Sequence, residues 1–222
     1  MQIKMPRLKR VFLISFIIEL VGFAIISSLP IHDPALYASF KSEDNSIISQ
    51  SFLPMWLSIF PHNLLIASIE FIPIIGIFMF IFSIGSTASV IAVEGTAEHE
   101  NGFEIFAILM LLPHSWLELP AYAVAVSTGT YIFYYLIKGT LRDNYKKILY
   151  MYLFIVVELA FAGAIETSEI LLEQSAHPLN VFYMWFPAIF IIIFLIWLYR
   201  RIDSGEYGNK KKEYNEYDFN QF

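Results

Sequence analysis

Long blocks of apolar residues constrain this chain more than any other feature of its sequence. The blocks cover residues 11–29, 62–93, 105–137, 148–165 and 181–199. Each is about 18 residues or longer, which is the length of helix that crosses about 30 Å of hydrocarbon. In lipid only helices and closed barrels satisfy every backbone hydrogen bond, and these blocks are continuously apolar and do not alternate. The sequence therefore predicts an all-α, polytopic transmembrane bundle.

The composition supports one membrane domain. The chain is 57% hydrophobic and 17% aromatic, values outside the usual range for soluble domains. No Gly-, Ser- or Pro-rich linker separates the blocks, so we expect one helical domain over residues 1–201 and a charged, disordered cytoplasmic tail over residues 202–222. The sequence contains no cysteine, which excludes a disulfide framework and a thiolate metal site. No nucleotide-binding or nucleic-acid-binding motif is present.

Basic residues cluster at three places, residues 4–10, 138–147 and 200–212. The positive-inside rule puts all three clusters in the cytoplasm, together with both termini of a multi-pass cell-membrane protein. That arrangement requires an even number of crossings, whereas the apolar blocks number five. The polar residues 31–50 and the aromatic residues 52–61 would form a non-cytoplasmic loop ending at the membrane surface.

A broken or re-entrant helix would reconcile the number of blocks with the charge rule. The blocks at residues 62–93 and 105–137 are both too long for one upright helix, and both contain proline. We favour a break between Pro113 and Pro120, with residues 73–76 as the alternative. The expected bundle then has about five to six helices.

A polar segment within the third block is the main candidate site. In a helix, His114 and Glu118 are four residues apart and share one face, as do Glu158 and Glu166 in the next block. Ionisable groups inside a membrane are unfavourable unless they are paired or face water. We therefore predict a polar intramembrane site of His114, Glu118, Glu158 and Glu166, with Asn63 from the second block. Pairing of His114 with one of these three carboxylates is expected.

Three interpretations of His114 and Glu118 stay open. They cap a helix broken by the two prolines, they belong to a proton or ion pathway, or they contribute to a metal site that activates water. The metalloprotease spacing H-E-x-x-H is missing. Ser115 is a poor nucleophile candidate because adjacent helical residues face different ways. We assign no catalytic residue, metal or other cofactor, and we do not expect an enzyme.

These residues also resemble a known family. The resemblance covers residues 11–170 and depends on the order of Asn63, Gly76, Gly85, the segment from Pro113-His114 through Glu118 to Ala121, Gly129 and Ile165-Glu166. This order resembles the stage II sporulation protein M family of integral membrane proteins. Ser115 stands where that family usually has glycine. The resemblance implies a protein of about five or six helices that acts in a membrane assembly, and it makes His114, Glu118 and Glu166 the positions to test.

Three functions are compatible with these features, and each predicts a different structure around His114 and Glu118. The first is a scaffold or subunit of a membrane complex, whose partners are the lipid bilayer and either a second copy of the chain or other subunits. The second is a small transporter or channel, which a water-accessible cavity reaching His114 and Glu118 would favour. The third is a metal-dependent intramembrane hydrolase, which requires at least three converging histidine or carboxylate groups. A tightly packed, dry cluster would favour the scaffold.

Overall fold

The structure is a computed structural model that describes residues 8–204. Within that range the chain forms only helices, which confirms the all-α bundle. Lys4, Arg7 and the part of the predicted tail after Ser204 lie outside the described residues. The elements are α1 (Leu8–Ser27), α2 (Pro34–Ile48), α3 (Phe52–Glu70), α4 (Ile75–Glu98), α5 (Gly102–Leu109), α6 (Ser115–Lys138), α7 (Leu141–Glu173), the 3₁₀ helix η1 (Pro178–Met184) and α8 (Trp185–Asp203).

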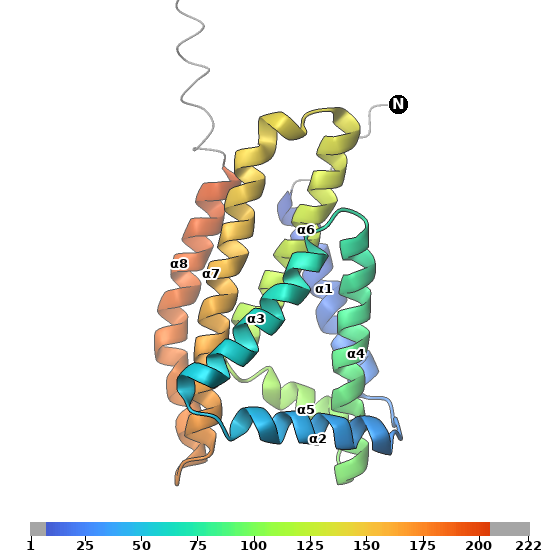
Figure 1. Cartoon of the computed structure of the whole chain (residues 1–222), viewed down its shortest axis with the longest axis vertical. Helices are drawn as coiled ribbons and strands as arrows, with labels where there is room; N and C mark the ends of the chain where they lie inside the picture. The colour runs from blue at the N-terminus through green and yellow to red at the C-terminus, as the bar shows by residue number, and fades with distance from the viewer. Residues whose placement is uncertain (1–7, 205–222) are drawn as a thin grey trace, which may run out of the picture.

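Five helical segments are long and apolar enough to cross a membrane: α1, α3, α4, α7 and the η1–α8 unit. The less apolar α6 is also 24 residues long and runs among them (Figure 1). Every residue of α6 from Ala121 to Gly129 is buried. Neighbouring helices cover this part of α6, so its serine, threonine and tyrosine residues have little contact with lipid. The helix with this long buried stretch is therefore the one of the long described helices that falls short of the apolarity of a membrane span.

Both of the long apolar blocks are broken at a proline. The first divides between α3 and α4 at residues 71–74, and the second divides between α5 and α6 at residues 110–114. Pro113 therefore lies at a break, whereas Pro120 lies inside α6. In the described range six helices have 19 or more residues. Five of them lie in segments that meet the length and apolarity of a membrane span, and α6 is the sixth.

The turn between α3 and α4 is unusually tight. Ile74 has a φ of 67°, a region that β-branched residues rarely adopt. A Cβ added to Gly76 would lie 1.8 Å from the carbonyl oxygen of Glu70, and one added to Gly129 of α6 would lie 2.9 Å from that of Phe71. Glycine at both positions lets the turn fold back on itself and rest directly against α6.

The two ends of the bundle differ in charge. The start of α1, the loop between α6 and α7 and the end of α8 lie at one end, whereas α2, α5 and η1 lie at the other (Figure 1). The described basic residues of the three predicted clusters are at the first end: Lys9, Arg10, Lys138, Arg142, Lys146, Lys147, Arg200 and Arg201. We refer to it below as the basic end.

Two segments that the sequence indicated as a loop are helical. Residues 34–48 form α2. Asp33 caps the start of this helix, because its carboxylate accepts hydrogen bonds from the N–H groups of residues 35 and 36. Such a cap, followed by proline at the first helical position, favours a helix start. The aromatic residues 52–61 form the first half of α3, and Trp56 donates to the carbonyl oxygen of Ala160 in α7 at 3.0 Å.

Candidate functional site

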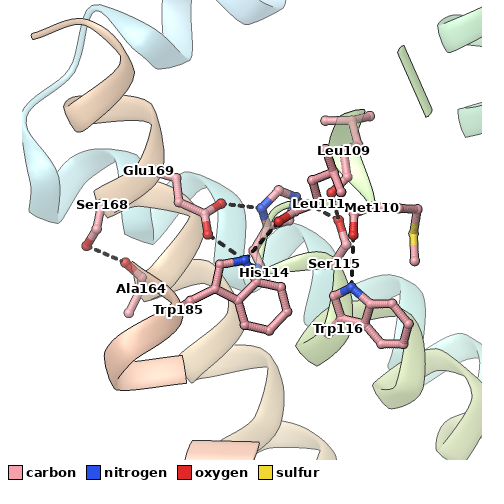
Figure 2. Close-up of polar contacts among 10 residues, drawn as sticks. All are labelled: Leu109, Met110, Leu111, His114, Ser115, Trp116, Ala164, Ser168, Glu169 and Trp185. Atoms are coloured by element: carbon pink, nitrogen blue, oxygen red, sulfur yellow. Dashed lines mark hydrogen bonds and ion pairs between the residues drawn. The ribbon is translucent and has the colours of Figure 1, made fainter. Parts of the chain in front are cut away.

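The break between α5 and α6 carries several polar contacts, and we call it, with its flanking residues, the polar elbow (residues 109–116). A broken helix leaves backbone carbonyls without intrahelical partners. The carbonyls of residues 109–111 accept hydrogen bonds from Ser115 Oγ at 2.8 Å, Trp116 Nε1 at 2.9 Å and Trp185 Nε1 at 2.9 Å, respectively. Figure 2 shows the three side chains around the break. The elbow therefore keeps its own carbonyls hydrogen-bonded, with one donor supplied by α8.

One carboxylate attaches the elbow to α7. Glu169 Oε1 accepts the backbone N–H of His114 at 3.3 Å, and Glu169 Oε2 pairs with Nδ1 of the same residue (Figure 2). Only 13% of the His114 side chain and 3% of the Glu169 side chain are exposed. A shielded pair with two contacts fixes both position and orientation. The histidine partner expected among Glu118, Glu158 and Glu166 is thus Glu169.

The predicted site did not include Glu169, which follows the apolar block of residues 148–165. In the structure α7 continues to Glu173, so Glu166 and Glu169 belong to its last two turns. The spacing of three residues between them carried a usable signal, since such residues share a helix face. That face is the one toward the elbow, where both groups interact electrostatically with His114.

The structure brings together three of the predicted site residues. Glu166 interacts electrostatically with His114 and Glu118. Glu118 accepts a hydrogen bond from Tyr122, one turn further along α6, at 2.9 Å. The bundle therefore holds a polar cluster at the junction of the elbow, α6 and α7. Sequence reasoning missed Tyr122, which looked like one more aromatic residue of an apolar span.

Glu158 and Asn63 lie away from the elbow. Glu158 is two turns before Glu166 on α7, and its buried Oε2 has no hydrogen-bond partner among the described residues. Asn63 of α3 lines a pocket of about 730 Å³ together with Glu166. Neither His114 nor Glu118 contributes to that pocket's lining. The cavity thus reaches the edge of the predicted site and not its centre.

Two further carboxyl groups are buried in the bundle. Glu19 of α1 and Glu70 at the end of α3 are almost completely covered. Ser83 Oγ of α4 donates to Glu70 Oε1 at 2.7 Å. Glu19 interacts electrostatically with Glu70 and Glu118, so the interior acidic groups extend from α7 to α1. The signal for Glu19 was its position as the single charged residue within an apolar block.

These buried groups are not arranged as a metal site. Among residues 8–204, no set of three or more histidine or acidic side chains is arranged to hold a metal ion. The geometry that would favour the hydrolase is therefore not found in this part of the chain.

Comparison with known proteins agrees with the resemblance seen in the sequence. A family model described as stage II sporulation protein M matches residues 11–168, from α1 through most of α7. The matched region contains the predicted site residues and ends one residue before Glu169. No curated protein and no solved structure is significantly similar to the chain.

Proposed function

We propose a scaffolding role in a membrane complex for this chain, which belongs to the stage II sporulation protein M family of membrane proteins. The polar elbow is the observation that carries the proposal. Its three carbonyls and its histidine are bound by side chains of the same protein. Polar groups occupied in this way hold helices together and are not free to bind a substrate.

The elbow contributes a defined shape to the bundle. An unsatisfied backbone group in lipid costs several kcal/mol, so an open helix break would be unfavourable at membrane depth. Interhelical hydrogen bonds in membranes contribute about 0.6–2 kcal/mol each. The contacts from Glu169 and Trp185 link the elbow to α7 and α8. A bundle braced in this manner presents a fixed surface to partner subunits.

The proposed orientation places the basic end in the cytoplasm. It is supported by the clustering of Lys and Arg at that end. The six long helices also support it, because an even number of crossings would put both termini on the same side of the membrane. Because the sequence contains no cysteine, single cysteines can report on it directly. Asn45→Cys in α2 should react with an impermeant maleimide in intact cells, whereas Lys146→Cys in α7 should react only after lysis. The reverse pattern would overturn the orientation.

The scaffold is tested by measuring assembly and flux on the same protein. The wild-type chain, cross-linked in its native membrane, should migrate as a complex, and Glu169→Gln should reduce that complex. Glu173→Gln, on the exposed part of the same helix, is the matched control and should leave it intact. Reconstituted vesicles should show no proton or cation flux above that of empty vesicles.

Transport is the competing function, and the pocket that reaches Glu166 is the observation that favours it. Flux in wild-type vesicles that is lost in Glu118→Gln, while thermal stability is unchanged, would replace the scaffold with a transporter. Assembly that is equally strong in Glu169→Gln and Glu173→Gln would also contradict the scaffold as argued from the elbow.

A further inference from the structure

A polar pocket of about 730 Å³ lies between α2 and α3, with α7 contributing to its lining. Figure 1 shows α3 rising steeply from the end of α2, at the end of the bundle opposite the basic end. Ile47 and Ile59 are the apolar exceptions in a lining of hydroxyl, amide, imidazole and carboxylate side chains. Small-molecule sites are usually lined mainly by apolar groups, so this lining indicates a strongly polar occupant.

The lining comes from polar faces on two helices. Ser39, Ser42 and Ser46 of α2 are spaced by three and four residues and therefore share one face. Ser58 and His62 of α3, spaced by four residues, form the other face. Both sets line the same pocket. The polar face of α2 is exposed to solvent and also forms one wall of the pocket.

Glu166 is the carboxylate that α7 contributes to this pocket, and its side chain is partly exposed. The neighbouring imidazole of His114 is bound to Glu169 instead. Glu43 adds a second carboxylate, and no lysine or arginine lines the pocket. The site is therefore electrostatically negative.

We propose that this pocket binds a small organic cation that also carries hydroxyl or other hydrogen-bonding groups. Two carboxylates in a lining without lysine or arginine favour a positively charged group, which would form a charge-assisted hydrogen bond with one of them. The hydroxyls of the three α2 serines and the amide of Asn63 can donate and accept hydrogen bonds, whereas Gln50 and Ser58 are already bonded to one another. The volume falls within the range of about 300–1,000 Å³ for small-molecule sites. Two carboxylates disfavour an anion of the same size.

The wall formed by α2 is already fixed in place. Lys41 bonds to Glu94 of α4 at 2.7 Å, and Gln174 Nε2, just after α7, donates to the carbonyl oxygen of Ile48 at 3.0 Å. These contacts hold α2 at the middle and at its C-terminal end. A preformed wall reduces the ordering that a ligand would otherwise have to bring about.

The test uses the full-length protein in lipid nanodiscs and three probes of nearly equal size. Serinol (2-amino-1,3-propanediol) is the cation, glycerol is its neutral counterpart and glycerate is the anion. Binding is measured by calorimetry and by saturation-transfer NMR. We expect serinol to bind at least about tenfold more tightly than glycerol or glycerate, a difference of about 1.4 kcal/mol.

Variants connect the binding to this pocket. Glu166→Gln should weaken serinol binding about tenfold, whereas Glu173→Gln on the same helix should leave it unchanged. Ser42→Leu projects a larger side chain into the pocket from the exposed helix α2 and should abolish binding without lowering the thermal stability. Ser42→Leu keeps the test decisive if Glu166→Gln alters folding.

Three results would overturn the proposal: no detectable serinol binding, equal binding of serinol and glycerol, or equal effects of Glu166→Gln and Glu173→Gln. The proposal does not depend on the scaffold. Assembly and flux test the scaffold, and probe binding tests the pocket, so each can fail without the other.

Discussion

Glu169 binds His114 twice, through the backbone N–H and through the ring, and thereby joins the α5–α6 elbow to the last turns of α7. The two residues are 55 positions apart in the sequence. A single carboxylate thus holds the break in the chain against the longest helix of the bundle. Much of the elbow's stability should depend on it.

Replacing Glu169 with Gln tests this dependence. The amide retains one acceptor for the backbone N–H but removes the charge beside a shielded imidazole. Breaking a buried pair costs about 3–5 kcal/mol, and we expect a loss near the lower value. The measurement is the free energy of unfolding in detergent micelles. Glu173→Gln should change it by less than about 0.5 kcal/mol, as surface substitutions do.

The tryptophan that α8 contributes to the elbow provides a second prediction. Trp185→Phe keeps the ring but removes the donor to the carbonyl oxygen of Leu111, leaving that acceptor unpaired. We expect a loss of about 1–2 kcal/mol in the free energy of unfolding. Trp197→Phe, also in α8 but half exposed, is the control. Equal effects of the two substitutions would show that the hydrogen bond is unimportant.

The tight turn between α3 and α4 leads to a third prediction, on glycine. Gly129→Ala places a methyl group 2.9 Å from the carbonyl oxygen of Phe71, and such overpacking costs about 1–3 kcal/mol. Gly85→Ala meets no atom within 4 Å and should be neutral or stabilising by up to about 1 kcal/mol. Thermal unfolding of the two variants should therefore shift in opposite directions or by clearly different amounts.

The attachment of α2 to α4 gives a fourth prediction. The hydrogen bond from Lys41 to Glu94 raises the pKa of this lysine above its ordinary value. A raised folded-state pKa means that the contribution is complete below the unfolded value of about 10.4 and is lost as the pH rises through the folded value. The ion pair of Lys41 and Glu94 should therefore make its full contribution to stability at neutral pH.

Lys41→Met should accordingly increase hydrogen exchange in α2 at neutral pH. The pair is partly exposed, so we expect a change in local opening free energy of at most about 1 kcal/mol. Lys146→Met, which makes the same chemical change on an exposed residue of α7, should not alter exchange in α2. Unchanged exchange in Lys41→Met would mean that other contacts hold this helix.

Hydropathy was sufficient to predict the long apolar helices, but not α2 or the first half of α3. Over residues 34–48 and 52–61 the hydropathy predicts a loop, because serine, acidic residues and proline lower it there. Their helicity depends on the Asp33 cap and on packing of α3 against α7. Local composition does not report such tertiary contacts. The break at Pro113 was predictable because proline lacks the N–H that a continuous helix requires.

The sequence was sufficient to predict several residues of the candidate site, but not which residue binds His114. His114, Glu118 and Glu166 share one electrostatic neighbourhood, as ionisable residues in apolar spans suggested. The partner of His114 depends on the rotation and length of α7, which spacing within one helix does not determine. The pocket was missed because its serines lie on α2, a helix that the sequence did not indicate.

The composition of α6 has a consequence for how the protein enters the membrane. Its buried stretch contains Ser127 and Thr128, and polar residues near the centre of a segment lower its tendency to leave the translocon for lipid. After a loop of two residues comes α7, which contains a stretch apolar enough to span a membrane. Insertion of α6 should therefore depend on its pairing with α7 during synthesis. The centre of this bundle would then form late, after both helices have left the ribosome.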